Sequence, residues 1–525
     1  MEKEMNGFAS EAEKDWKAFW KDYRAIGWCL AVVVFLVYGL RLMHDNIFLD
    51  SEIMMLRPEE MEQQWLSNGR FGLVFTRRLF GMGRMIPYLE AALMMAAMWV
   101  AGILLSFCAY EWCGKNRRYG RFLYLFPVMF LVCPVFAEHY LFLLQAFEVA
   151  LGMVLCIVAA GCVGRLVYED ESIWWLVPGL VCMVWAFGSY QVMMAFYICL
   201  VLCSFLLSYM NGKSERAFQY GCKHVLVFLG GAVLYALVSA VCKRVSGIDT
   251  DYVSGQFRWG VDDWRNCLAG IWAGVVPVLK GQNVFFGKFY FPVMCLFGVQ
   301  ALIYGWRKKQ GGVNYCWFVL GLVLMILSPF FLMLVSGGVM PLRTQLVYPV
   351  TSAFFLAHLT VCPEESERKG WTRAAVTVMT VVCGLQAMKS GQSAVQLFQT
   401  SWEAYRNDVL TSNRIYEDVC DAVEGDIRDY KVIFVGGRDA GLAGPMMRGE
   451  LLGLSLYEAE AHTAVGVTGR VISLFQILGL ETGGIESGFD EYYARAKEAV
   501  AAAPVWPETG SIVIVDDVAA VKLSE

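Results

Sequence analysis

Charged residues are scarce in this chain of 525 residues. Asp, Glu, Lys and Arg together make up 17% of it and hydrophobic residues make up 57%, whereas soluble domains carry about a quarter charged residues. The scarcity excludes an ordinary soluble protein and indicates one that crosses a membrane many times. The formal net charge is −5, so no basic field points to a nucleic-acid partner.

Histidine is scarce as well, and the usual cofactor motifs are missing. Neither the 5 histidines nor the 17 cysteines show the spacing of a metal site. The sequence also lacks a glycine-rich phosphate loop and a dinucleotide-binding fingerprint. We therefore expect no cofactor, and no motif supports a divalent metal.

The chain does have many apolar runs of about 17–25 residues, the length that spans a bilayer. We expect about eleven spans. They are roughly 26–43, 88–110, 122–137, 141–164, 173–187, 190–210, 223–242, 289–306, 314–336, 345–361 and 374–390. The short loops alternate between rich in Lys and Arg and nearly free of both. The positive-inside rule then places the N-terminal segment 1–25 in the cytoplasm.

Three predicted outer segments are long enough to hold a site: loops 44–87 and 243–288, and the C-terminal region 391–525. The C-terminal region contains β-branched runs near 431–436 and 511–516 with helical stretches between them, which predicts a small α/β domain. The expected fold is an all-α polytopic membrane bundle, 26–390, followed by this extracytoplasmic domain.

The first predicted outer loop opens with acids in the run HDNIFLDSE. Asp50 and Glu52 lie just beyond the first span, at the boundary of water and lipid. An enzyme that acts on a lipid-linked substrate needs a general base there. Asp50 is our first choice for this base and Glu52 the second, and Asp45 is a candidate substrate ligand in the same loop.

The rest of this loop is predicted to form two interfacial helices. Arg57-Pro58-Glu59-Glu60 is a helix start, since Pro suits the first position and acids suit the first turn. Gly69 is a helix stop, and a second helix is expected over 71–80. Two such helices would cover a site at the membrane surface.

Arginines in the two long outer loops break the trend that keeps basic residues inside. We single out Arg70, Arg77 and Arg258. Guanidinium groups match phosphate oxygens, so these side chains are candidates for binding a lipid phosphate. The alternative is that they rest on lipid headgroups.

Polar side chains also fall at the outer ends of later spans. They are Glu138, His139, Ser189, Tyr190, Gln191 and Arg343. Polar groups at membrane depth are functional candidates, although hydrogen bonds between helices explain Ser189 and Gln191 equally well. All of them fall on the same side as Asp50, so we predict substrate contacts there.

Four short motifs follow one another along the chain: Leu49-Asp50-Ser51-Glu52, Asn68-Gly69-Arg70, Ser189-Tyr190-Gln191 and Pro341-Leu342-Arg343. In this order they resemble the polytopic Gtr-type glucosyltransferases, typified by phage-encoded, serotype-converting O-antigen enzymes, and more broadly the C class of glycosyltransferases (GT-C). The resemblance implies a polyprenyl-phosphate-linked donor such as undecaprenyl-phosphate glucose, a cell-surface glycan acceptor and a catalytic Asp or Glu in the first outer loop. The chain lacks an adjacent Asp-Asp or Asp-Glu pair there, so the choice between Asp50 and Glu52 stays open.

The predicted function is therefore glycosyl transfer at the outer face of a bacterial cytoplasmic membrane. Two other membrane functions compete with it. A transporter or flippase of lipid-linked sugars often shows inverted repeats, and no clear repeat is present. A polymerase of lipid-linked oligosaccharides is usually organised around one large late outer loop and not around acids after the first span.

Overall fold

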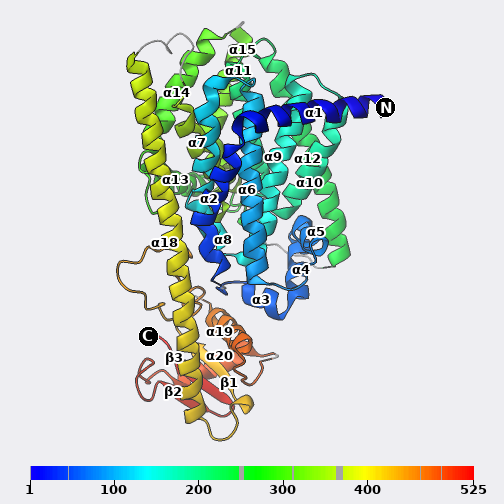
Figure 1. Ribbon diagram of the computed structural model, residues 1–525. Helices are drawn as coiled ribbons and strands as arrows, with labels where there is room; N and C mark the ends of the chain where they lie inside the picture. The colour runs from blue at the N-terminus through cyan, green and yellow to red at the C-terminus, as the bar shows by residue number, and fades with distance from the viewer. Residues whose placement is uncertain are drawn as a thin grey trace.

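A computed structural model describes residues 2–44, 46–247, 254–309, 312–361, 370–461, 463–485 and 487–525. Long helices stand side by side in a bundle, and α1 (Glu2–Tyr23) lies across one end of it (Figure 1). The opposite end carries a small sheet with its helices (Figure 1). We call these two ends the α1 end and the sheet end.

The bundle contains helices of very different length. They are α2 (Ala25–Tyr38), α6 (Pro87–Trp112), α7 (Gly120–Leu131), α9 (Ala146–Tyr168), α10 (Leu176–Ser189), α11 (Met193–Met210), α12 (Ala217–Ser246), α13 (Trp264–Lys280), α14 (Tyr290–Arg307), α15 (Gly312–Leu327), α16 (Phe331–Ser336), α17 (Val347–His358) and the first part of α18 (Gly370–Ala422). The predicted class of fold, an apolar helical bundle with a small C-terminal sheet, is confirmed.

Seven helical stretches among the described residues are long and apolar enough to cross a membrane. They are Ala25–Leu42, Pro87–Trp112, Leu143–Tyr168, Met193–Met210, Ala217–Ser246, Gly312–Ser336 and Gly370–Ala422. Other predicted spans coincide with shorter helices. The span predicted at 122–137 is divided between α7 and α8 (Val135–Tyr140), because Pro134 cannot continue the hydrogen-bond ladder of α7.

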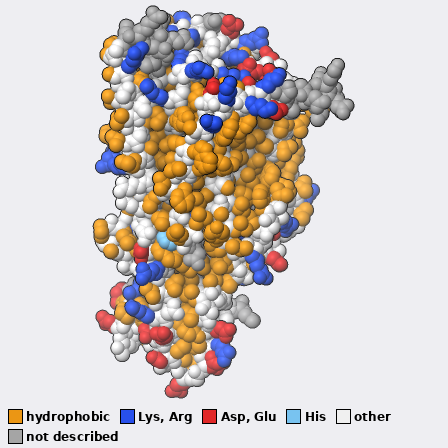
Figure 2. All heavy atoms as spheres, viewed as in Figure 1, with side chains coloured by type: hydrophobic (Ala, Val, Ile, Leu, Met, Phe, Trp, Pro, Cys, Tyr) orange, Lys and Arg blue, Asp and Glu red, His pale blue; other side chains and the backbone are white. Residues whose placement is uncertain are grey.

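A belt of hydrophobic side chains surrounds the middle of the bundle on the face in view (Figure 2). Helix α12 contributes strongly to such a surface, since Val225, Leu226, Val233, Leu237 and Val241 are all exposed. Lys and Arg side chains gather at the α1 end of the same view (Figure 2). An apolar belt between polar ends is the surface that a bilayer requires of a membrane protein.

The first predicted outer loop folds into three short helices at the sheet end, α3 (Ser51–Leu56), α4 (Pro58–Ser67) and α5 (Phe71–Leu79). Helix α4 begins at Pro58 with Glu59 and Glu60 in its first turn, as predicted. Helix α5 packs closely on α10, where a Cβ at Gly72 would stand 2.5 Å from the backbone nitrogen of Ser189. Gly72 therefore sets how near the first loop lies to the bundle.

The C-terminal unit contains a three-stranded sheet in the order β1-β3-β2. Strand β1 (Lys431–Val435) runs parallel to β3 (Val518–Lys522), and β2 (Ile512–Val515) pairs antiparallel with β3. Helices α19 (Ala464–Leu478) and α20 (Phe489–Ala499) pack with these strands. The predicted strands and helices of this region are all present.

The bundle and the C-terminal unit share one helix. Helix α18 is continuous over 53 residues, so the predicted boundary at 390/391 falls inside it and its second half belongs to the predicted C-terminal region. Because an α-helix rises about 1.5 Å per residue, α18 carries the chain from the bundle to the sheet without a flexible linker. The predicted outer loop 243–288 is not a plain loop, because it contains the 17-residue helix α13.

Candidate functional site

The two candidate catalytic carboxylates lie at the sheet end, where the first loop enters α3. Asp50 precedes α3 with φ of +67°, a left-handed conformation that costs free energy for a residue with a side chain and is common at functional sites. The Asp50 side chain is 43% exposed, whereas that of Glu52 is 0% exposed. Asp45 lies outside the described residues.

One arginine of the C-terminal unit contacts both carboxylates. Nη2 of Arg470, on α19, donates to Oδ1 of Asp50 at 3.0 Å, and Nη1 donates to Oε1 of Glu52. Its Nε donates to Oε2 of Glu460 at 3.0 Å. Burial raises the pKa of Glu52 above its ordinary value, and the Arg470 charge pulls it back in part.

Sequence reasoning missed Arg470, because it lies 420 positions from Asp50 and in no motif. One signal was present: Arg470 is the sole charged residue in α19, whose sequence is AVGVTGRVISLFQIL. A lone arginine on an apolar helix is costly to bury unless it is paired. That signal indicates a partner but does not say which one.

A second group of predicted residues meets around Tyr190. The Arg70 guanidinium carbon lies 5.2 Å from the centre of the Tyr190 ring, and the His139 ring centre lies 5.6 Å from it. Next to Tyr190 in the chain, Gln191 donates through Nε2 to the backbone oxygen of Asn68 at 2.7 Å. The structure therefore joins the first loop to two later predicted spans at the sheet end of the bundle.

Arg343 completes this group from η7 (Leu342–Thr344). Its guanidinium carbon lies 4.9 Å from the ring centre of Phe142, and its backbone oxygen lies 3.3 Å from Nδ1 of His139. Burial lowers the pKa of His139 to about 3, so this imidazole is neutral at ordinary pH. Within the described residues, neither Arg70 nor Arg343 forms an ion pair with a carboxylate.

Glu138, the neighbour of His139, binds backbone of the C-terminal unit. Its Oε1 accepts from the backbone nitrogen of Leu451 at 2.5 Å. Burial raises the pKa of Glu138 to about 7. In return, Glu450 accepts from the backbone nitrogen of Leu342 at 2.8 Å. Glu138 thus fastens a loop of the C-terminal unit to the bundle.

Two other predicted phosphate ligands, Arg77 and Arg258, lie away from the group around Tyr190. Arg77 is wholly buried, and its Nη1 donates to Glu90 at 2.7 Å and to Glu148 at 2.9 Å. Arg258 is exposed, lies 3.4 Å from Asp262 and donates its backbone N–H to Ser336 at 2.7 Å. The structure does not bring either side chain to the Tyr190 group.

A family model described as Glucosyl transferase GtrII matches residues 39–360. The chain belongs to this glucosyl transferase family. No curated protein and no solved structure matches it. The resemblance to Gtr-type glucosyltransferases that the four motifs carry is confirmed.

The range that matches the GtrII family includes the first loop with Asp50 and Glu52, the Tyr190 group and Arg343. It ends before α18, so the C-terminal unit and Arg470 lie outside it. No three His, Cys, Asp or Glu side chains gather as metal ligands in the part of the chain that the structure describes.

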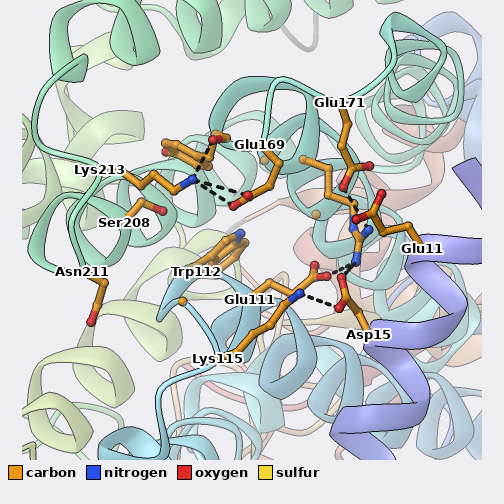
Figure 3. A pocket seen from close by; sticks show the side chains of 15 residues that line it. Glu11, Asp15, Glu111, Trp112, Lys115, Glu169, Glu171, Ser208, Asn211 and Lys213 are labelled. Atoms are coloured by element: carbon orange, nitrogen blue, oxygen red, sulfur yellow. Dashed lines mark hydrogen bonds and ion pairs between the residues drawn. The ribbon is translucent and has the colours of Figure 1, made fainter.

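A cavity of about 210 Å³ also opens at the α1 end (Figure 3). Several of its charged side chains form ion pairs: Lys115 lies 2.5 Å from Asp15, and Arg165 bonds Asp15, Glu111 and Glu171. Figure 3 shows Asp15 approaching from α1 toward Lys115. These pairs join α1 to the bundle, at the end opposite to Asp50 and Glu52.

Proposed function

We propose that this protein transfers a glucosyl group from a polyprenyl-phosphate-linked donor to a cell-surface glycan at the outer face of the cytoplasmic membrane. Membership of a glucosyl transferase family supports the reaction class, and the apolar belt supports a donor held in lipid. The observation that carries the proposal is that an accessible carboxylate lies at the same end of the bundle as two arginines that form no ion pair with a carboxylate among the described residues.

The residues divide into roles by their exposure. Asp50 is the general base, because a base must reach the acceptor hydroxyl and the Asp50 side chain is 43% exposed. The hydroxyl oxygen attacks the anomeric carbon as Asp50 takes its proton. The bond from that carbon to the phosphate oxygen breaks, and the electron pair leaves with the polyprenyl phosphate. Arg70 and Arg343 stabilise the departing phosphate through charge-assisted hydrogen bonds.

The direct test is a transfer assay with the full chain reconstituted in closed lipid vesicles. Undecaprenyl-phosphate glucose labelled in the sugar is supplied with a lipopolysaccharide fraction, and label in the polysaccharide is counted. We expect transfer from this donor and none from UDP-glucose. Movement of the lipid-linked sugar across vesicles without transfer would replace the proposal with a flippase, and lengthening of lipid-linked glycan without label transfer would replace it with a polymerase.

Replacing Arg70 or Arg343, the arginines proposed to bind the donor phosphate, by lysine should weaken donor binding. Lysine keeps the charge but cannot make the two-pronged contact of a guanidinium. Hydrogen bonds to charged groups contribute about 1.5–3 kcal/mol, so Arg70→Lys and Arg343→Lys should each raise the KM for undecaprenyl-phosphate glucose by roughly 10- to 100-fold. Arg78→Lys is the matched control, since exposed Arg78 pairs with Glu62. An unchanged KM in both test variants would assign Arg70 and Arg343 to headgroup contacts.

The proposed orientation places the α1 end in the cytoplasm. It rests on the Lys and Arg excess in the loops at that end, which include Arg117, Lys213 and Arg307. A reporter active only in the cytoplasm should therefore be silent when fused after Glu525 and active when fused before Met1. Fluorescence or enzyme activity of the C-terminal fusion in whole cells is the measurement. An active C-terminal fusion would reverse the orientation and move Asp50 to the cytoplasmic face.

A further inference from the structure

The contact between Arg470 and the first loop joins the C-terminal unit to the proposed active site. The Arg470 side chain is only 15% exposed, and its guanidinium bonds Asp50, Glu52 and Glu460 at the same time. A guanidinium is a rigid planar fork, so three bonded carboxylates fix its position and orientation. The Arg470 guanidinium is therefore fixed relative to all three carboxylates.

The three carboxylates around Arg470 are not equivalent. Glu52 has no exposed side-chain surface, so a sugar hydroxyl cannot reach it while α3 is in place. Glu460 belongs to the C-terminal unit itself. Asp50 alone combines a bond to Arg470 through Oδ1 with a side chain that reaches solvent. Among the described residues, its other oxygen accepts no hydrogen bond.

A second attachment shows that this docking does not depend on Arg470 alone. Glu138 accepts from the Leu451 backbone, and Glu450 accepts from the Leu342 backbone. These hydrogen bonds join the C-terminal unit to the segments that carry His139 and Arg343. Removing the Arg470 side chain therefore leaves other contacts that hold the unit in place.

We propose that Arg470 is a positioning residue for glucosyl transfer, supplied to the active site by the C-terminal unit. It binds Oδ1 of Asp50 and so turns the second carboxylate oxygen toward the acceptor hydroxyl, while Glu52 and Glu460 hold the guanidinium. This inference rests on the proposed function, because it gives Arg470 a task only if Asp50 is the base. It also gives Glu52 a role, as an anchor of Arg470.

The expected effect of removing Arg470 is on turnover. A reacting group displaced by about 1 Å can cost on the order of 10²-fold in rate. Arg470→Ala should therefore lower kcat by about 10²-fold, with little change in the KM for undecaprenyl-phosphate glucose, because Arg70 and Arg343 still bind the phosphate. Arg470→Lys keeps the charge without the fork and should fall between the alanine variant and the wild type.

A double-mutant cycle separates positioning from a merely structural role. If Arg470 acts through Asp50, then Asp50→Asn with Arg470→Ala should be no slower than Asp50→Asn alone, whereas independent effects would multiply. Arg495→Ala is the matched control. Arg495 lies on α20 of the same unit and pairs with Asp516 and Asp517, so its loss should leave kcat unchanged. Thermal unfolding of each variant reports whether the fold is kept, and Arg470→Lys serves if the alanine variant unfolds.

Each outcome decides between named alternatives. Two results would overturn the positioning of Asp50 by Arg470: a kcat of Arg470→Ala near the wild-type value, or losses that multiply in the double variant. Neither result contradicts the proposed function if Asp50→Asn alone still lowers transfer. A kcat of Arg470→Ala above the wild-type value would overturn the positioning role in favour of an inhibitory contact. Full activity of Asp50→Asn would overturn Asp50 as the base, and this inference with it, whereas no label transfer by the wild type would overturn the proposed function itself.

Discussion

Asp50→Asn is expected to abolish most glucosyl transfer, with a loss of about 10²–10⁴-fold in kcat, the range for removal of a general base. The asparagine amide keeps the size of the carboxyl group but does not take a proton from the acceptor hydroxyl. Asp50 is 43% exposed and shares Arg470 with two other carboxylates, so the fold should survive the change. The measurement is label transfer from undecaprenyl-phosphate glucose, beside a thermal unfolding curve.

Glu59→Gln is the matched control for this change. Glu59 is exposed in the first turn of α4, within the same loop, and should keep wild-type turnover. Glu52→Gln should be milder than Asp50→Asn, because a buried glutamine still accepts one hydrogen bond from Arg470. Near-normal turnover in both Asp50→Asn and Glu52→Gln would remove the first loop from the chemistry.

The sequence predicted which segments meet at the site, because membrane topology limits the arrangement. Loops on one side of a bilayer share one end of the bundle, and so the sequence alone places Arg70, His139, Tyr190 and Arg343 near one another. Helix starts in the first loop followed from Pro58 and the acids after it. These predictions needed only the alternation of basic and neutral loops, the composition of the segments and their order along the chain.

Burial and long-range pairing could not be predicted in the same way. A pattern of residues does not reveal that Arg77 pairs inside the bundle or that Glu138 accepts from the Leu451 backbone. Arg470 lies in a region that no motif tied to sugar chemistry, and its partners depend on how α18 carries the C-terminal unit beneath α3. That geometry follows from one uninterrupted helix of 53 residues, whereas the hydropathy of the sequence changes midway along it.

The ionic cluster around Arg77 should be the most sensitive point for stability. Arg77, Glu90 and Glu148 all have side chains that are 0% exposed, and Arg77 also donates to the backbone oxygen of Leu144 at 2.9 Å. Breaking a buried ion pair by removing one partner costs about 3–5 kcal/mol, because the remaining charge is left buried alone. Arg77→Met should therefore lower the free energy of unfolding in detergent micelles by about this amount.

The cluster matters for the site because it anchors α5, the helix that begins just after Arg70. Arg77→Met should consequently reduce donor affinity as well as stability, although Arg77 does not touch the Tyr190 group. Arg78→Met, one position along and 69% exposed at its side chain, should change neither quantity much. Adding Glu90→Gln and Glu148→Gln to the Arg77→Met variant should restore most of the lost stability. The two uncompensated buried charges are then gone. If Arg77→Met alone unfolds like the wild type, the two acids carry no buried charge, and the attachment of α5 rests on its contacts with α10, which include the hydrogen bond from Trp185 to Thr76.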